Sequence, residues 1–310
     1  MKRLDASEHG ILEISWSPDG EWVVYTTGNE VRLANVETGD IRTIGEGTSP
    51  GMTTDNRVVF ERNGEVWAAS GNKIHPVVSK NQVVKESPKG LPLPSPDGDQ
   101  MIFVVFNVYD KVSQSLNAYP HRHFIGLATP MGGGAVLTKE QWYGGGALWF
   151  PDCSRFAHFE FDSTAGPQIH IVSRKGKKEG IIAGLYPSVA PDGIHIATRP
   201  RTGGSIMIYS TKGGWTETEV SMSTVKLPIT ESHRPSAIPP IWLDNRTAVI
   251  VEGEEAYRVD TKKEKAELLK KFPIPTDRRT PSMVPSPDRE QVAMEIAVDG
   301  GYELRVGRPI

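Results

Sequence analysis

The chain has 310 residues, one cysteine and a formal net charge of −3, with acidic and basic residues mixed along its length. This balance provides no general field for nucleic acid or for an anionic membrane surface. No apolar run approaches the roughly 18 residues of a membrane-spanning helix, and the first ten residues lack the apolar segment of a secretory signal. We therefore expect a cytoplasmic protein that binds neither nucleic acid nor membrane, in keeping with the lone Cys153.

The first predicted unit surrounds the turn Pro18-Asp19-Gly20. Short apolar runs at 12–16 and 22–25 flank this turn, and the runs at 30–34 and 40–44 add a third and a fourth strand. Proline presets φ at such a turn, aspartate accepts a bond from the backbone two residues on, and glycine adopts a left-handed conformation. The turn is therefore predicted to have a structural role.

Related turns recur along the whole chain. Seven turn aspartates lie 36 to 55 residues apart, namely Asp19, Asp55, Asp97, Asp152, Asp192, Asp244 and Asp288. Their mean spacing of about 45 residues is the length of a four-stranded propeller blade. Each turn is followed by a second-strand run, at 57–60, 101–106, 156–159, 194–197, 247–250 and 291–294. The sequence predicts an all-β, seven-bladed β-propeller that forms a single domain over residues 1–310, with a six-bladed ring as the alternative.

Two segments can be assigned only from their positions in the repeat. Residues 262–271 are rich in helix formers, but their place in the repeat predicts a turn and an outer strand. Residues 2–4 are similar to 41–44, the outer strand of the first unit. We expect them to supply the missing outer strand of the last unit and to close the ring, because closure removes exposed strand edges.

The Ser-Pro-Asp-Gly turns carry a family resemblance. Residues 17–20, 95–98 and 190–193 resemble the Pro-Asp variety of WD-type propeller repeats, as found in the TolB C-terminal propeller and in prolyl-oligopeptidase-type peptidases. The resemblance covers nearly the whole chain and implies the propeller fold. It implies no function, because propellers host many activities and no functional residue of either family maps onto a matched motif.

The longest departures from the repeat all fall on the face opposite the Pro-Asp turns, at 107–123, 139–146 and 221–236. Long loops in a compact domain are usually functional or disordered, and aromatic and arginine side chains dominate binding hot spots. The candidate binding residues are Tyr119, His121, Arg122, His123, Trp142, Tyr143, His233 and Arg234.

These loops predict a non-catalytic interaction module that binds a protein partner through its insertion-rich face. Such a module would serve as a scaffold or as a structural component of an assembly such as a phage virion. The sequence carries no signal for an oligomeric state. The alternative is a lyase or hydrolase that acts at the central channel, with assistance from a metal or from His121, His123 or His233.

No catalytic residue, metal or cofactor is predicted. His121 and His123 would point the same way on a strand, and Asp110 or Glu231 could join them, but the spacing fixes no third metal ligand. Ser49 lies in a G-x-S-x-G pattern at 47–51, yet a strand follows it, where a nucleophile elbow requires a helix.

Overall fold

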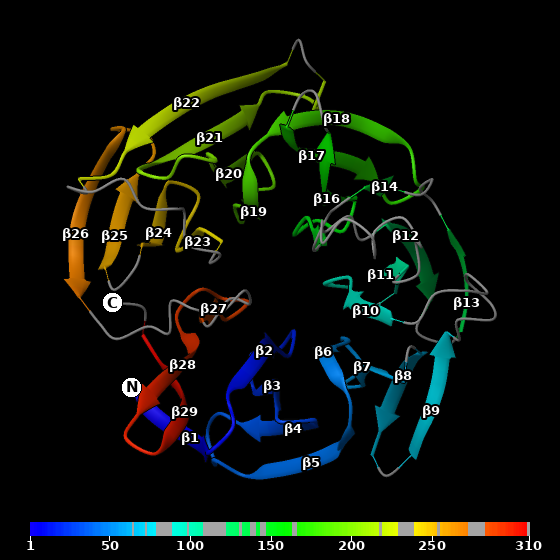
Figure 1. Ribbon diagram of the computed structural model, residues 1–310. Helices are drawn as coiled ribbons and strands as arrows, with labels where there is room; N and C mark the ends of the chain where they lie inside the picture. The colour runs from blue at the N-terminus through cyan, green and yellow to red at the C-terminus, as the bar shows by residue number, and fades with distance from the viewer. Residues whose placement is uncertain are drawn as a thin grey trace, which may run out of the picture.

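Seven antiparallel sheets surround a common axis in the computed structural model (Figure 1). The structure describes residues 1–63, 65–71, 73–78, 89–97, 99–107, 122–129, 132–136, 141–142, 147–162, 166–216, 219–228, 239–252, 255–271 and 283–308. This arrangement confirms the seven-bladed propeller and rules out the six-bladed alternative. That residues 1–310 form one domain stays a prediction.

The first four blades follow one another along the chain, each with its innermost strand first. Blade 1 contains β2 (Ile11–Trp16), β3 (Trp22–Thr27), β4 (Glu30–Asn35) and β5 (Ile41–Glu46). Blade 2 contains β6 (Thr48–Met52), β7 (Val58–Arg62), β8 (Glu65–Ser70) and β9 (Lys73–Val78). Blade 3 contains β10 (Lys89–Pro94), β11 (Met101–Asn107), β12 (Arg122–Thr129) and β13 (Gly132–Val136), and β14 (Gln141–Trp142) also pairs with β12. Blade 4 contains β15 (Ala147–Trp149), β16 (Arg155–Asp162), β17 (Gly166–Ser173) and β18 (Lys178–Ala183).

The last three blades complete the ring. Blade 5 contains β19 (Leu185–Val189), β20 (His195–Arg199), β21 (Ser205–Thr211) and β22 (Val220–Lys226). Blade 6 contains β23 (Ile241–Trp242), β24 (Thr247–Glu252), β25 (Glu255–Asp260) and β26 (Lys265–Lys271). Blade 7 contains β27 (Met283–Pro285), β28 (Val292–Val298), β29 (Gly301–Gly307) and, as its outer strand, β1 (Lys2–Ser7) from the other end of the chain.

Ring closure by the N-terminus is confirmed. Strand β1 pairs with β29 from Lys2 to Ser7. Asp5 of β1 also accepts a 2.6 Å hydrogen bond from the hydroxyl of Tyr25 and a 3.1 Å bond from Arg32, both in blade 1. The segment with helix-forming residues is the outer strand β26, as the repeat predicts. A strand edge that needs a partner outweighs helix propensity at that position.

The Pro-Asp turns are structural, as predicted. In the first turn, the Ser17 hydroxyl donates to Asp19 Oδ1 at 2.5 Å, and the same carboxylate accepts the Glu21 N–H at 3.0 Å. The Ser95–Asp97 and Ser286–Asp288 pairs repeat the first of these bonds. Three inner-strand tryptophans then join neighbouring blades, because each indole N–H donates to a carbonyl of the preceding innermost strand: Trp16 to Val284, Trp149 to Leu93 and Trp242 to Ser188.

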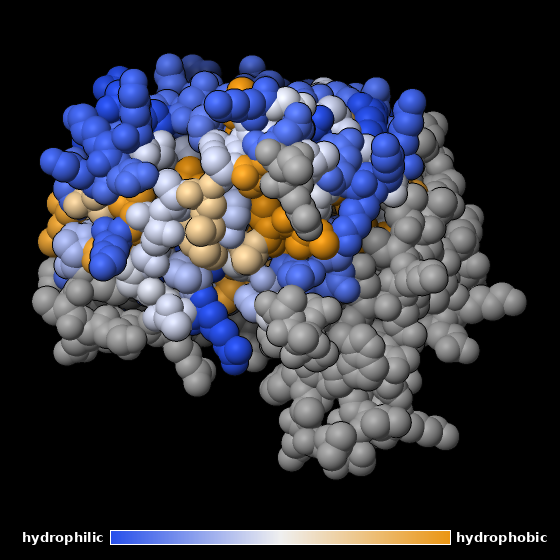
Figure 2. Space-filling model, turned by 90° about the horizontal axis from the view of Figure 1, so that it is seen from above, coloured by the Kyte–Doolittle hydropathy of each residue, from blue (hydrophilic) through white to orange (hydrophobic). Residues whose placement is uncertain are grey.

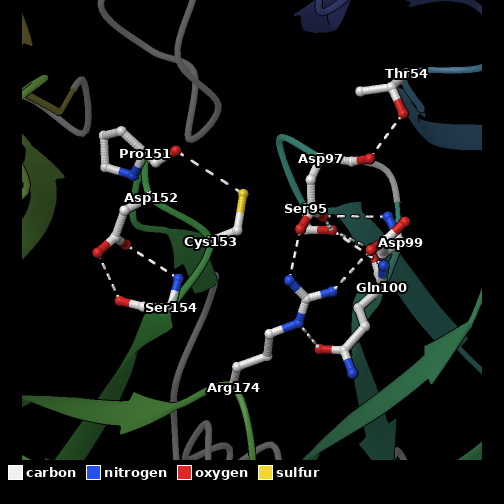
Figure 3. A network of polar contacts seen from close by, with 10 residues as sticks. All are labelled: Thr54, Ser95, Asp97, Asp99, Gln100, Pro151, Asp152, Cys153, Ser154 and Arg174. Carbon is white, nitrogen blue, oxygen red and sulfur yellow. Dashed lines mark hydrogen bonds and ion pairs between the residues drawn. The ribbon is translucent and has the colours of Figure 1, made fainter.

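A polar network joins blades 2, 3 and 4 on the face that carries these turns (Figure 3). Arg174 forms a 2.5 Å ion pair with Asp97 and donates to Gln100 at 3.0 Å, while Thr54 donates to the Asp97 carbonyl at 2.7 Å. Partial burial alone would raise the pKa of the Asp97 carboxyl, but the bonds from Ser95 and Arg174 outweigh it and hold that pKa below its usual value. The turn aspartate therefore serves blade packing.

The outer wall is formed by the fourth strands. Figure 2, a view of the rim, shows hydrophilic side chains along one edge and apolar ones gathered in the middle of the wall. Exposed apolar residues on outer strands include Ile41, Met222 and Leu268. Separate exposed apolar residues are common on protein surfaces. No helix in the described part of the chain is long and apolar enough to cross a membrane.

One predicted loop is partly wrong. The connection expected at 221–236 begins as the outer strand β22, which pairs with β21 from Val220 to Lys226. Polar residues alternate along this strand, so it is hard to recognise in the sequence. An outer strand has one face in water, whereas the inner strands are covered on both faces and are rich in apolar residues. Residues 229–238 lie outside the described part of the chain.

Candidate functional site

The second strand of each blade ends beside the start of the innermost strand. Thr27 pairs with Ile11 in blade 1, and Arg199 pairs with Leu185 in blade 5. These positions define the loop face, on which the connections between blades enter the ring. The Pro-Asp turns lie at the other end of the same strands. Functional side chains are therefore expected on the loop face, where the connections do not follow the repeat.

Three innermost strands contain a bulge near the loop face. The register shifts in β2, β6 and β19. Each shift includes a residue with positive φ, namely Glu13 and Ser49 at 53° and Tyr186 at 49°. By contrast β10 pairs with β11 without a shift. Bulges re-aim side chains and recur next to active sites, and the left-handed region costs energy for residues other than glycine. All three side chains are half-buried.

A buried ion pair lies next to the strand of Tyr186, since Arg199 pairs in register with Leu185. Arg199, at the end of β20 in blade 5, pairs with Glu252, at the end of β24 in blade 6. The two side chains are 0 % and 2 % exposed. The guanidinium atoms Nε and Nη1 have no hydrogen-bond partner among the described residues. Charges taken out of water cost several kcal/mol unless they are fully compensated, so this pair needs a reason beyond packing.

Equivalent positions in other blades show that the fold does not require the pair. In each blade, a backbone carbonyl closes the turn between the first and second strands: that of His195 in blade 5 and that of Thr247 in blade 6. Arg199 is the fourth residue after the first carbonyl, and Glu252 is the fifth residue after the second. Between blades 4 and 5 these positions hold Phe159 and Pro200, and between blades 6 and 7 they hold Val251 and Ile296. An apolar pair therefore satisfies the same layer of the propeller.

The electrostatics tie the pair to the bulge. Burial lowers the pKa of Arg199 to about 10, and attraction to the phenolate form of Tyr186 opposes that shift. Arg199 thus remains a cation at neutral pH. The buried pair is therefore coupled electrostatically to the strand that carries the bulge at Tyr186.

The opposite side of the ring carries a carboxylate. Figure 1 places β2 and β6 across the axis from β19. Glu13 Oε2 accepts the Ser49 N–H at 2.5 Å and the Thr26 hydroxyl at 3.2 Å, and Oε1 accepts the Ser49 hydroxyl at 3.1 Å. These bonds fix the carboxylate between blades 1 and 2 and identify it as an acceptor.

A third polar cluster lies in blade 4. His158 is 1 % exposed and its ring lies 5.1 Å from that of His170, while Glu160 Oε2 lies 3.1 Å from His170 Nε2. Burial, and then the charge of Lys178, lower the pKa of His170 to about 4. His170 is therefore neutral at physiological pH.

The binding residues predicted from the sequence remain untested. Arg122 and His123 belong to β12 and Trp142 to β14, where Arg122 pairs with Trp142 in register. These three positions therefore lie at the same end of the blade 3 sheet. The others lie outside the described residues, as do both carboxylates considered as metal ligands: Tyr119, His121, Tyr143, His233, Arg234, Asp110 and Glu231.

The G-x-S-x-G pattern has a structural explanation. A Cβ at Gly47 would lie 2.5 Å from the Phe60 ring, and one at Gly51 would lie 2.7 Å from Pro94. Ser49 lies within a strand, so the strand–turn–helix setting of a nucleophile elbow is missing, as expected. Sequence analysis missed Tyr186, Arg199 and Glu252. Alignment of the second strands would have placed Arg199 and Glu252 at matching ends of neighbouring blades, but other blades also carry charges at these positions, such as Glu61 and Glu295.

No protein-family model matches the sequence, and no curated protein matches it. A solved oligogalacturonate lyase in complex with manganese is similar over 99 % of this chain and 92 % of its own, with a TM-score of 0.72 at 13 % identity. An oligogalacturonate lyase from Vibrio parahaemolyticus gives the same identity and coverage with a TM-score of 0.71. TolB from Acinetobacter baumannii covers 74 % of this chain and 57 % of its own at 16 % identity, with a TM-score of 0.49. At these identities the likeness shows the propeller fold alone.

The comparisons correct one prediction. The expectation of a non-catalytic interaction module, with its scaffold and virion roles, is contradicted, because the two lyases that match nearly the entire chain are enzymes. They favour the alternative expectation of a propeller lyase. The prediction rested on the long loops and their aromatic and arginine residues, and it did not take account of the charges buried between blades 5 and 6. A protein partner, the absence of nucleic-acid and membrane binding, and the compartment stay predictions.

Proposed function

We propose that this protein is a propeller enzyme that cleaves an acidic oligosaccharide by β-elimination on the loop face, around the propeller axis. The observation that carries the proposal is the Arg199–Glu252 pair, buried between blades 5 and 6 next to the strand that contains the bulge at Tyr186. The substrate class is suggested by the lyases that share the fold.

Tyr186 would act as the general base. In β-elimination from a uronate, the base removes the proton on the carbon next to the carboxylate. The electron pair of that C–H bond forms a C=C bond, the C–O bond to the neighbouring sugar breaks, and the leaving oxygen takes up a proton. The reaction consumes neither water nor an oxidant. A tyrosine can serve as base when a nearby cation stabilises its phenolate.

Arg199 and Glu252 would support Tyr186 from within the wall. Both are too buried to contact a substrate, so we assign them as positioning residues. The guanidinium favours the phenolate of Tyr186, and Glu252 holds the guanidinium in place. Such a fixed charge in a water-poor setting acts more strongly than the same charge in water.

The manganese in the similar lyase structure raises the question of a metal here. The described residues contain no group of three or more His, Cys, Asp or Glu side chains that could hold one. They therefore do not fit a metal, and no step of the proposed reaction is routed through one.

The test is a direct assay for the new double bond. Purified protein is incubated with oligogalacturonate, and the ultraviolet absorbance of the C=C bond conjugated to the carboxylate is followed. We expect absorbance to rise with the wild type and the rate to fall at least about 100-fold in Tyr186→Phe, which keeps the ring and loses the acid–base oxygen. The matched control is Tyr302→Phe in β29 of blade 7.

Two results would overturn the proposal. One is no absorbance change with any of several uronate oligomers. The other is new reducing ends without absorbance, which would indicate hydrolysis.

A further inference from the structure

We propose that Glu13 recognises sugar hydroxyls across the axis from Tyr186, and so determines how the oligosaccharide lies in the ring. This inference rests on the proposed function, because it assigns the second half of the same site. The argument depends on the position of Glu13, on the bonds that hold its carboxylate, and on the backbone at its strand.

The position is across the ring from the base. Glu13 lies on β2, which Figure 1 places on the far side of the axis from β19, the strand of Tyr186. Both residues are half-buried at bulges in innermost strands. A ligand that lies on the axis would pass between the two strands, and this geometry suits a sugar ring whose opposite edges carry different groups.

The carboxylate is fixed but not saturated. It accepts three hydrogen bonds, from Thr26 and from the backbone and hydroxyl of Ser49. A carboxylate offers about four lone-pair sites, so acceptor capacity remains for a ligand hydroxyl. A hydrogen bond to a charged acceptor is roughly twice as strong as a neutral one. Sugar hydroxyls are the natural donors for such an acceptor.

The backbone is strained at Glu13 and Ser49. Glu13 and Ser49 both adopt positive φ, and such conformations cost about 1–3 kcal/mol each when the residue is not glycine. The fold itself does not need the bulge, since Leu91 of β10 pairs directly with Val104. The strain at Glu13 and Ser49 is therefore explained by the placement of the carboxylate.

The same carboxylate would orient an acidic ligand. A uronate carboxylate near Glu13 would be repelled by the Glu13 carboxylate. Each uronate ring carries hydroxyls on one edge and its carboxylate on the opposite edge, so the hydroxyl edge is expected to face blades 1 and 2, and the carboxylate edge to face blades 5 and 6.

The experiment compares Glu13→Gln with the wild type, using oligogalacturonate as the probe. We expect KM to rise roughly tenfold, the effect of one charge-assisted hydrogen bond, while kcat stays within about twofold. Ser49→Ala, which loses only the side-chain bond to Glu13, should shift KM in the same direction by less. The matched control is Glu30→Gln, a carboxylate of the same blade that pairs with Arg32, and it should leave both constants unchanged.

Other outcomes would overturn the inference. An unchanged KM in Glu13→Gln excludes recognition by this residue, and a large loss of kcat alone would place it in the chemical step instead. If the wild type is inactive, the proposed function fails, and calorimetric binding of oligogalacturonate then decides the role of Glu13. Weaker binding by Glu13→Gln than by the wild type supports recognition, and equal or absent binding refutes it.

Discussion

Arg199 of β20 and Glu252 of β24 form an ion pair that joins blades 5 and 6 with both side chains out of contact with water. Removal of one partner leaves the other charge unpaired in the protein interior. We expect Arg199→Met to lower the free energy of unfolding by about 3–5 kcal/mol. The double variant Arg199→Met/Glu252→Leu should recover most of that loss, because equivalent positions between blades 6 and 7 are Val251 and Ile296.

Urea unfolding measures this prediction. The matched control is Arg246→Met, which removes the exposed arginine of the Arg246–Asp260 pair in blade 6 and should leave the midpoint nearly unchanged. If Arg199→Met were as stable as the wild type, the guanidinium would not be buried as described.

Acid should weaken the fold through His170. Burial and Lys178 lower the pKa of His170 to about 4, below its unfolded value of 6.5. The unfolded state therefore binds more protons between these values, and stability falls as pH decreases from about 6.5 to 4. Over this pH range, we expect the free energy of unfolding to fall by on the order of 2 kcal/mol less in His170→Gln than in the wild type.

Thermal unfolding measured at several pH values tests the role of His170. His195, which contacts Asp192 near the Pro-Asp turn of blade 5, provides the control substitution. Parallel pH profiles for the wild type and His170→Gln would show that Glu160, 3.1 Å from the ring, keeps the imidazole protonated.

The closing strand should depend on Asp5. Its carboxylate accepts bonds from Tyr25 and Arg32, so Asp5→Ala leaves a buried tyrosine hydroxyl without its acceptor. We expect a loss of about 1–3 kcal/mol in the free energy of unfolding. Asp40→Ala, in an exposed turn of blade 1, is the control. Equal stability of Asp5→Ala and the wild type would mean that β1 closes the ring through its backbone alone.

The network between blades 3 and 4 gives a fourth prediction. The pKa of Asp97 lies below its usual value because Ser95 and Arg174 outweigh the effect of burial. The stability from this group is present at neutral pH and is lost as pH falls through the lowered pKa. Arg174→Met should reduce stability at pH 7 and make the acid-induced loss shallower. Urea unfolding at several pH values tests this. If the pH dependence of the free energy of unfolding were the same in Arg174→Met and the wild type, Arg174 would not lower the pKa of Asp97.

The sequence predicted the architecture because local chemistry repeats. Turns such as Pro18-Asp19-Gly20 and anchors such as Trp16 recur at blade spacing, and each can be read without knowledge of the rest of the fold. Even β26, with its helix-forming residues, was placed correctly once its position in the repeat was used.

The candidate site could not be predicted in the same way. Tyr186 is distinguished by a bulge, which leaves no mark in the sequence, and Arg199 meets Glu252 only because two blades are neighbours. The sequence drew attention instead to long loops, where Tyr119, His121 and their neighbours still await a test. Backbone strain and burial between blades are tertiary properties that residue spacing does not record.

The most direct test of the account is the activity of Arg199→Met/Glu252→Leu on oligogalacturonate, measured by the absorbance of the unsaturated product. The double variant restores an apolar layer, so it should fold as the wild type does and keep most of its stability. The account predicts a folded ring whose kcat falls at least about 100-fold. A folded double variant with wild-type kcat would contradict it, because the buried pair would then have no part in catalysis.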